Sequence, residues 1–309
     1  MTLPKTYIGV DVAKDWIDIF TARTQRSNRI FNQHTELTKW AHSLQDNAMV
    51  IFEATGRYDR ALAECLESKG IAYARVNPLR ARQFARASGL LAKTDQLDAR
   101  ILCVMGEALH PEPAVPTQQH RQRLQDLQAR RDDIVTMVIA EQNRLSVADD
   151  AFITKDLKAS IRALTKRKNA LQNQINAHVE AHDDLKTQNQ QLQSVPGVGP
   201  QTACQLMASM PELGHVNRKQ IASLAGLAPH ARDSGLYKGK RTIHGGRHRV
   251  RRAMYMAALV AIRWDPHWQT VYTNMRDEGK AAKTAIIAVA RRMLVRINAM
   301  MKTGENYQT

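Results

Sequence analysis

The spacing of apolar and polar residues over the first third of the chain predicts alternating strands and helices. The stretch YIGVDVAKDWIDIFTA holds two short β-rich runs, at 7–12 and 16–22, and SNRIFNQ offers a third with polar alternation. Their close spacing is typical of a meander of hairpins. TELTKWAHSLQ then has apolar residues at helical spacing, with Thr35 as the expected N-cap. AMVIFEA, residues 48–54, is a continuous apolar run, as expected for a strand buried on both faces.

The pattern then continues with helix, strand and two further helices. A helix is predicted over 58–69, ending at Gly70, and IAYARV is predicted as a strand ending at Pro78. Helices are predicted over 79–88 and 94–108. Three hairpin strands followed by helix, strand, helix, strand and helix is the order of an RNase H-like fold. We therefore expect an α/β domain over residues 1–110.

A long helical arm is expected next, over residues 117–194. PEPAVP, 111–116, is a Pro-rich boundary, and neither Gly nor Pro occurs from Thr117 to Val195. Leucine and isoleucine residues recur at spacings of three and four, which predicts a coiled-coil hairpin with VADDAFITKD as its turn. Such an arm most often serves for oligomerisation or as a spacer.

A second compact domain is expected over 195–309, beginning at VPGVGP. The pattern predicts an all-α, mainly helical domain with little strand, with helices over 201–210, 217–226, 247–264, 267–278 and 280–301. VPGVGP before a helix also resembles the turn of a helix-hairpin-helix motif, in which Gly197 and Gly199 would offer backbone N–H groups to a phosphate. An ordinary turn between helices is the alternative.

The net charge indicates which class of partner the protein binds, and the cysteines indicate its redox environment. The chain has 309 residues and a net charge of +16, from 45 Lys and Arg against 29 Asp and Glu. Such a surplus favours a polyanion, above all nucleic acid. No apolar run approaches the roughly 20 residues that span a bilayer, and no export signal is recognisable, so we expect no membrane partner and a cytoplasmic, nucleoid-associated protein. Cys65, Cys103 and Cys204 stand far apart and are expected to be buried and reduced.

Four acidic residues form the first candidate for chemistry. Asp95 and Asp98 stand three apart in KTDQLDAR, whereas Asp11 and Glu53 end the first strand and the buried strand. Ligand sites gather at the carboxyl ends of strands in open α/β sheets, and the first and fourth strands are neighbours in an RNase H-like sheet. Four carboxylates brought together there would need a cation, and Mg²⁺ or Mn²⁺ suits oxygen ligands. The alternatives are a solvated helical face, a strand end and a helix cap.

Basic residues form the second candidate. Lys93 could hold a phosphate, while Thr94 could cap the helix that carries the two aspartates. HARDSGLYKGKRTIHGGRHRVRR, 230–252, carries eight Lys or Arg from Arg232 to Arg252 against one acid, Asp233. Glycines 239, 245 and 246 would let the backbone approach a phosphate. We expect nucleic-acid contacts from Arg232, Lys238, Lys240, Arg241, Arg247, Arg249 and Arg251. A solvated basic face is the alternative.

Ser234, His244 and His248 lie in the same segment. The two histidines are four residues apart but have no Cys or acidic partner to complete a zinc site. Taken alone, Ser234 reads as a turn residue of an Asp-Ser-Gly turn.

These motifs together resemble the IS-one-ten family of insertion-sequence transposases. The resemblance covers about residues 5 to 300 and rests on GVDVAKD, FEATGRY, VNPLRARQFARASG, KTDQLDA, SVPGVGPQTA, LAGLAPHARDSG and GGRHRVRRAMYMAAL. It implies a RuvC-like domain whose Asp-Glu-Asp-Asp tetrad matches Asp11, Glu53, Asp95 and Asp98. It also implies a C-terminal transposase domain whose nucleophilic serine matches Ser234.

The same resemblance implies partners that the residues alone would not. Its members use a structured noncoding bridge or guide RNA to pair with donor and target DNA, so that base pairing makes the sequence choice. They act as tetramers, as a dimer of dimers, with a site composed of one subunit's carboxylates and another's serine. We therefore expect a recombinase that works through a covalent phosphoserine. A metal-dependent nuclease or junction resolvase and a silent nucleic-acid-binding protein are the alternatives.

Overall fold

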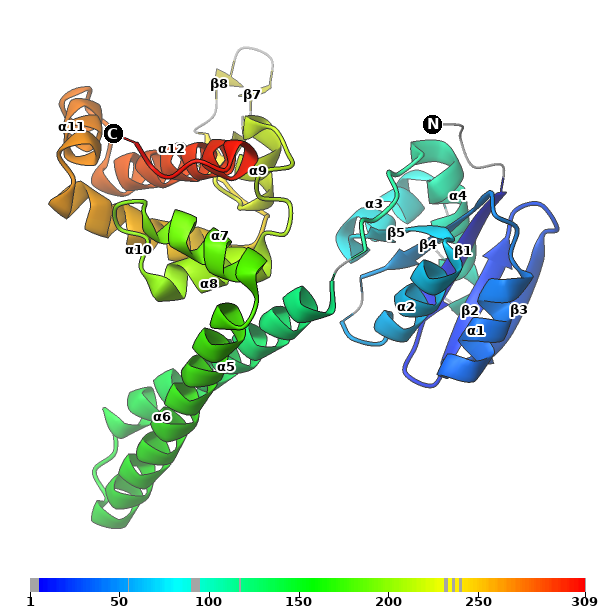
Figure 1. Ribbon diagram of the computed structural model, residues 1–309, viewed down its shortest axis with the longest axis horizontal. Helices are drawn as coiled ribbons and strands as arrows, with labels where there is room; N and C mark the ends of the chain where they lie inside the picture. The colour runs from blue at the N-terminus through cyan, green and yellow to red at the C-terminus, as the bar shows by residue number, and fades with distance from the viewer. Residues whose placement is uncertain are drawn as a thin grey trace. The chain divides into compact units, whose positions relative to one another are not determined.

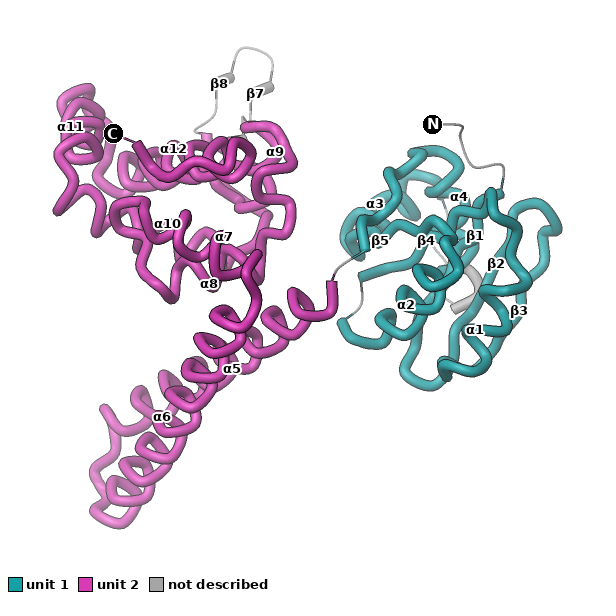
Figure 2. Tube along the Cα trace, in the orientation of Figure 1, with its two compact units in different colours: residues 1–116 teal, residues 117–309 magenta. Residues whose placement is uncertain are grey.

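The computed structural model describes residues 6–54, 56–89, 95–116, 118–230, 233–234, 237–238 and 241–308. For residues 95–97, 230, 233–234 and 237–238 it describes the backbone. The chain divides into two compact units, residues 1–116 and residues 117–309 (Figure 2). Each unit has a hydrophobic core of its own.

The first unit is built on a five-stranded mixed sheet of order β3-β2-β1-β4-β5 (Figure 1). Its strands are β1 Thr6–Val12, β2 Trp16–Thr21, β3 Arg26–Phe31, β4 Ala48–Glu53 and β5 Ala72–Val76. The first three pair antiparallel as a meander, whereas β4 pairs parallel with both β1 and β5. The first and fourth strands are thus neighbours, as the sequence predicts.

Helices cover both faces of this sheet. They are α1 His34–Ser43, α2 Arg60–Lys69, α3 Pro78–Ala87 and α4 Asp95–Leu109. In β4, Val50 and Phe52 pack into the cluster that contains α1 and α2, while Met49 and Ile51 pack with α3 and α4. Because both faces of β4 are buried, its sequence is apolar throughout instead of alternating. This mixed α/β arrangement is consistent with the expected RNase H-like, RuvC-like domain.

Helix ends in this unit agree with the sequence at one place and differ at another. α2 ends at Gly70, whose φ of 72° lies in the left-handed region that glycine adopts readily. The prediction of Thr35 as the N-cap of α1 is wrong, because the N-cap is Gln33. The side-chain amide of Asn32 donates to the carbonyls of Ala13 and Tyr58, and this anchor turns the chain into the helix earlier.

The second unit is mostly helical (Figure 1). Its helices are α5 Gln119–Leu145, α6 Ala151–Glu180, α7 Asp183–Gln193, α8 Pro200–Ser209, α9 Arg218–Leu224, α10 His248–Trp264, α11 Pro266–Asp277 and α12 Ala282–Thr303. Helices α5 and α6 form an antiparallel helical hairpin that extends away from the other helices of this unit. Leu157 and Ile134 are among the buried residues along its length.

The helical hairpin differs from its prediction at both ends. The turn is shorter than VADDAFITKD, because Asp150 caps α6 by accepting from the backbone N–H groups of Phe152 and Ile153. At the base, α6 ends at Glu180, and α7 packs against α8 instead of prolonging the hairpin. The helical hairpin is therefore shorter than the expected arm of residues 117–194.

Short strands occur where the sequence predicts almost none. β6 Pro229–His230 pairs with β9 Thr242–Ile243, and β7 Asp233–Ser234 pairs with β8 Tyr237–Lys238. The Gly-Leu pair between β7 and β8 in the sequence is typical of a two-residue hairpin loop and could have predicted this one.

The cysteines are buried, as the sequence predicts. All three cysteines are free and buried, and burial raises the pKa of the Cys103 thiol to about 11. Within the described ranges, no helix is both long and apolar enough to cross a membrane.

Candidate functional site

Asp11 and Glu53 lie side by side at the carboxyl ends of β1 and β4. The parallel register of these strands runs from Thr6 opposite Ala48 to Val10 opposite Phe52, and the two acidic residues directly follow that last pair. Both side chains are partly buried. Two strand ends thus bring two carboxylates to one edge of the sheet, as the sequence predicts.

Two glycines let α4 lie directly against β1. A Cβ atom at Gly9 would come within 1.9 Å of the Ala99 carbonyl oxygen and 2.5 Å of the Cys103 nitrogen. At Gly106 a Cβ atom would come within 2.8 Å of the side chains of Tyr7 and Ile51. No side chain fits at either position, so glycine sets the distance between helix and strand.

The same contacts give the direction of α4. The start of β1 lies against the end of α4, because the Tyr7 hydroxyl is 2.9 Å from Nδ1 of His110 and the Tyr7 carbonyl accepts from Cys103. Gly9, two residues further along β1, lies against Ala99. Helix α4 therefore runs antiparallel to β1, and its first turns, with Asp95 and Asp98, point toward the end of β1 that carries Asp11.

The electrostatics of Glu53 fit this direction. Burial raises the pKa of Glu53, and the negative charge of Asp98 raises it further. The Arg82 guanidinium on α3 acts in the opposite sense and lowers the pKa of Glu53. Asp98 and Glu53 thus interact across the edge of the sheet. Arg82 was missed by the sequence analysis, although VNPLRARQFARASG places it in a helix that begins at the same edge.

Carboxylates that raise one another's pKa are a fitting donor set for a hard divalent cation, since a cation relieves their repulsion. Among the described side chains, however, no group of three or more His, Cys, Asp or Glu is already arranged around one point. The side chain of Asp95, together with Lys93 and Thr94, lies outside what the structure describes.

Ser234 lies in a short hairpin in the second unit. Backbone pairing joins Asp233 to Lys238 and Ser234 to Tyr237, so Ser234 has strand rather than turn geometry. The side chains of Ser234 and Lys238 are not among the described ones, and Arg232, Gly239 and Lys240 lie outside the described residues.

Three of the predicted nucleic-acid-binding arginines have partners inside the protein. Arg247 donates two hydrogen bonds of 2.6 Å to the Glu212 carboxylate. Arg249 lies 3.4 Å from Asp132 and 3.9 Å from Asp133 on α5. Arg251 donates to the carbonyls of Gly226 and Gly245. Each interaction fixes local structure.

Arg241 is exposed, as is Arg249. Gly246 also has an internal role, because a Cβ atom there would lie 2.2 Å from the Gly226 nitrogen. A Cβ atom at Gly245, in contrast, would meet nothing within 4 Å.

The two glycines of VPGVGP have different surroundings. Gly197 has a φ of 83°, and a Cβ atom there would lie 2.2 Å from the Ala257 carbonyl oxygen of α10, so this glycine permits helix packing. Gly199 is the N-cap of α8 and has open space around it.

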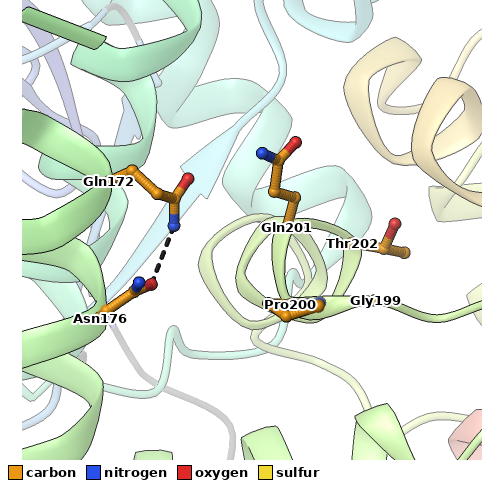
Figure 3. A pocket seen from close by; sticks show the side chains of 6 residues that line it. All are labelled: Gln172, Asn176, Gly199, Pro200, Gln201 and Thr202. Atoms are coloured by element: carbon orange, nitrogen blue, oxygen red, sulfur yellow. Dashed lines mark hydrogen bonds between the residues drawn. The ribbon is translucent and has the colours of Figure 1, made fainter. Parts of the chain in front are cut away.

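Gly199 lines an open depression of about 440 Å³ between α6 and the start of α8 (Figure 3). On its α6 side, the side-chain amide of Gln172 donates to Asn176 over 2.9 Å. Gly199 is therefore the better candidate of the pair for a phosphate contact.

Comparison with known proteins finds a matching transposase family model in each half of the chain. Residues 8–152 match a DEDD transposase family model, and residues 189–273 match the model described as "Transposase IS116/IS110/IS902 family". The chain is 30% identical to a pilin gene-inverting protein of Moraxella bovis, over 99% of this chain and 98% of the relative. It is 33% identical to an uncharacterized 43.6 kDa protein of insertion element IS110 from Streptomyces coelicolor, over 51% of this chain and 38% of the relative.

These matches show the class of protein to which the chain belongs. A DEDD domain joined to a second transposase domain makes the protein an enzyme of DNA transposition and recombination, and a DEDD domain implies the use of a divalent metal ion. The chain belongs to the IS116/IS110/IS902 family of transposases.

Proposed function

We propose that this transposase cuts and rejoins DNA through a covalent phosphoserine at Ser234, with a metal site built from Asp11, Glu53, Asp95 and Asp98. The observation that best supports this metal site is the interaction of Asp98 with Glu53, at the edge of the sheet where Asp11 lies. That edge is where open α/β sheets form their sites. Mg²⁺ or Mn²⁺ bound there would polarise the scissile phosphate and offset the charge of the transition state.

Each step of the proposed reaction forms one phosphoester bond and breaks another. The Ser234 Oγ attacks the scissile phosphorus, the Oγ–P bond forms, and the bond to the leaving deoxyribose oxygen breaks. The serine proton ends on that oxygen, which becomes a free hydroxyl. After strand exchange a free DNA hydroxyl attacks the phosphoserine, reseals the strand and returns the proton to Ser234. No ATP is needed, because the bond energy stays in the phosphoserine.

Covalent capture of labelled DNA tests the mechanism. Full-length protein, RNA from the flanking region, Mg²⁺ and end-labelled donor DNA are mixed and run on a denaturing gel. We expect a protein–DNA adduct with the wild type that is absent with Ser234→Ala and with EDTA. Asp98→Asn is expected to lower adduct formation by at least about a hundredfold, the scale of losing one stabiliser of transition-state charge.

Thr242→Ala is the matched control, since Thr242 is an exposed hydroxyl residue of β9, which belongs to the other short strand pair of this segment. It should form the adduct normally. Metal-dependent cutting that leaves no adduct and is unchanged by Ser234→Ala would instead identify a nuclease or junction resolvase that activates water.

We also propose that a noncoding bridge RNA selects donor and target DNA and that the enzyme works as a tetramer. The charge of +16 supports a partner of this kind, because the protein must hold RNA and two duplexes together. Replacing the pairing bases of the RNA should redirect cleavage to the complementary DNA. Cleavage that ignores such a replacement would contradict the RNA-guided part alone.

Inversion is a second candidate outcome, favoured by the match to a pilin gene-inverting protein over 99% of this chain. A plasmid with two sites in inverted orientation should then give inverted product. A product formed only from one site and an unlinked target would indicate insertion instead.

A further inference from the structure

The outer face of α6 carries a row of positive charges that the catalytic proposal does not use. α6 contains six Lys or Arg and two acidic residues, Asp156 and Glu180. Its partner α5 is nearly balanced, with five Arg and four acidic residues. The surplus charge of the helical hairpin therefore lies on α6.

Four of these cations share one face of the helix. Lys155, Lys158, Arg162 and Lys166 follow each other at spacings of three, four and four, which puts them in one row along the helix. We call this row the basic stripe. Leu157 and Ile161, whose spacing puts them on the other side, belong to the face that packs against α5. The basic stripe thus points away from α5.

The basic stripe is available to a ligand. All four side chains are exposed, and in the part of the chain that the structure describes none of them forms an ion pair or a hydrogen bond. The acids of α5 are engaged elsewhere: Glu141 pairs with Arg144, and Asp132 pairs with Arg249. Four uncompensated cations in one row repel one another, so the row costs stability unless a polyanion binds it.

The dimensions of the stripe fit a nucleic-acid backbone. The eleven residue-to-residue steps from Lys155 to Lys166, at 1.5 Å each, span about 16 Å of α-helix. A strand of duplex nucleic acid carries one phosphate per roughly 3.4 Å of axis, so about five phosphates lie along that length. A charged row without aromatic residues contacts phosphates rather than bases, which gives affinity without sequence choice.

We propose that the basic stripe of α6 binds the phosphodiester backbone of a nucleic-acid duplex. The helical hairpin is then a binding arm as well as a spacer or an oligomerisation element. The inference adds a nucleic-acid surface to the proposed recombinase but does not depend on Ser234 or on the carboxylates.

Binding of the full-length protein to 20-base-pair duplexes tests the proposal. The test variant carries Lys155→Gln, Lys158→Gln, Arg162→Gln and Lys166→Gln. The matched control loses the same charge at four exposed, scattered positions, through Arg23→Gln, Lys69→Gln, Lys283→Gln and Lys302→Gln. Fluorescence anisotropy gives Kd for an RNA duplex and a DNA duplex of one sequence, from 50 to 200 mM salt.

Each phosphate contact contributes about 0.9 to the slope of log Kd against log salt, so the stripe variant should lose about 3 to 4 of that slope. Its Kd at low salt should rise at least about tenfold, whereas the control should change little. If the stripe variant loses affinity for one duplex type only, that duplex is the ligand of the basic stripe. If it loses affinity for both, the basic stripe binds the backbone of RNA and of DNA duplexes alike.

Equal slopes for the stripe variant and the control, with both duplexes, would overturn the proposal. Circular dichroism and thermal melting verify that both variants are folded. The adduct assay with Ser234→Ala is independent of this result, so failure of the phosphoserine mechanism and failure of the binding stripe give different data.

Discussion

At the scale of single residues, Arg247 illustrates how a basic side chain in a basic segment can serve the fold. It precedes α10 and holds the Glu212 carboxylate with two hydrogen bonds. Burial alone would raise the pKa of Glu212, but the hydrogen bonds and charge of Arg247 outweigh it and hold that pKa below its usual value. In the sequence, Arg247 is indistinguishable from the exposed Arg241, because charge and spacing do not record a partner 35 residues away.

Arg247→Gln should destabilise the protein by about 1–2 kcal/mol at pH 7, the scale of charge-assisted hydrogen bonds reduced for partial exposure. A depressed carboxyl pKa stabilises the folded state above the unfolded pKa, and this stabilisation is lost as pH falls through the folded pKa. The deficit should therefore shrink below the ordinary Glu pKa of 4.5. Urea denaturation at several pH values measures it.

Arg241→Gln is the control and should leave the free energy of unfolding unchanged at every pH. A deficit of Arg247→Gln that stays constant as the pH is lowered from 7 to well below 4.5 would show that packing, and not the ion pair, carries the effect.

At the scale of elements, the contact of α4 with β1 determines whether the acidic residues can act together. Gly9 and Gly106 remove the side chains that would otherwise separate helix and strand. The antiparallel direction of α4 then brings its first turns toward Asp11 and Glu53. A helix packed further out, or in the other direction, would leave Asp98 away from this edge.

Gly9→Ala should destabilise the first unit by about 1–3 kcal/mol, because the new Cβ atom collides with the backbone of α4. It should also lower adduct formation by the protein that remains folded, since α4 must shift. Ile71→Val is the control, as Ile71 is buried on the other face of the sheet and the change costs about 0.5–1.5 kcal/mol. Both quantities come from a denaturant titration and the adduct gel.

Ile71→Val should keep its adduct formation despite the loss of stability. If Gly9→Ala does the same, the position of α4 has no bearing on the chemistry.

At the scale of the whole molecule, the two compact units bury separate cores. The hydrophobic cluster of the second unit joins the base of α5 and α6 to α8, α10 and α12. The two hydrophobic clusters of the first unit lie on opposite faces of the sheet. Separate cores allow separate unfolding, so two-state behaviour is not expected for the full chain.

Differential scanning calorimetry should resolve two transitions. Leu66→Ala, on α2, should lower one of them, and Leu294→Ala, on α12, should lower the other, since each removes a fully buried side chain at a cost of about 2–5 kcal/mol. A single transition lowered equally by both substitutions would indicate that the units unfold together.

The sequence by itself determined the order and type of the elements of the first unit and of most helices of the second unit. Strand-length apolar runs, helical spacing and stops such as Gly70 are local signals, and they predicted the sheet, the helical hairpin and the helices of the second unit other than α7. The motifs also indicated the transposase family, which the comparisons confirm. The expected cap of α1 was wrong, because the contacts of Asn32 with Ala13 and Tyr58 decide where that helix begins. The strand pairs around Ser234 were missed, although the Gly-Leu pair is a local signal for one of them.

Only the tertiary structure decided which charged residues meet and which are already engaged. The interaction of Glu53 with Asp98, the nearby charge of Arg82 and the partners of Arg247 and Arg249 join segments far apart in the chain, as does the bond from Arg251 to the Gly226 carbonyl. The physical reason is that electrostatic energy depends on distance and burial, and neither follows from sequence spacing once the chain has folded.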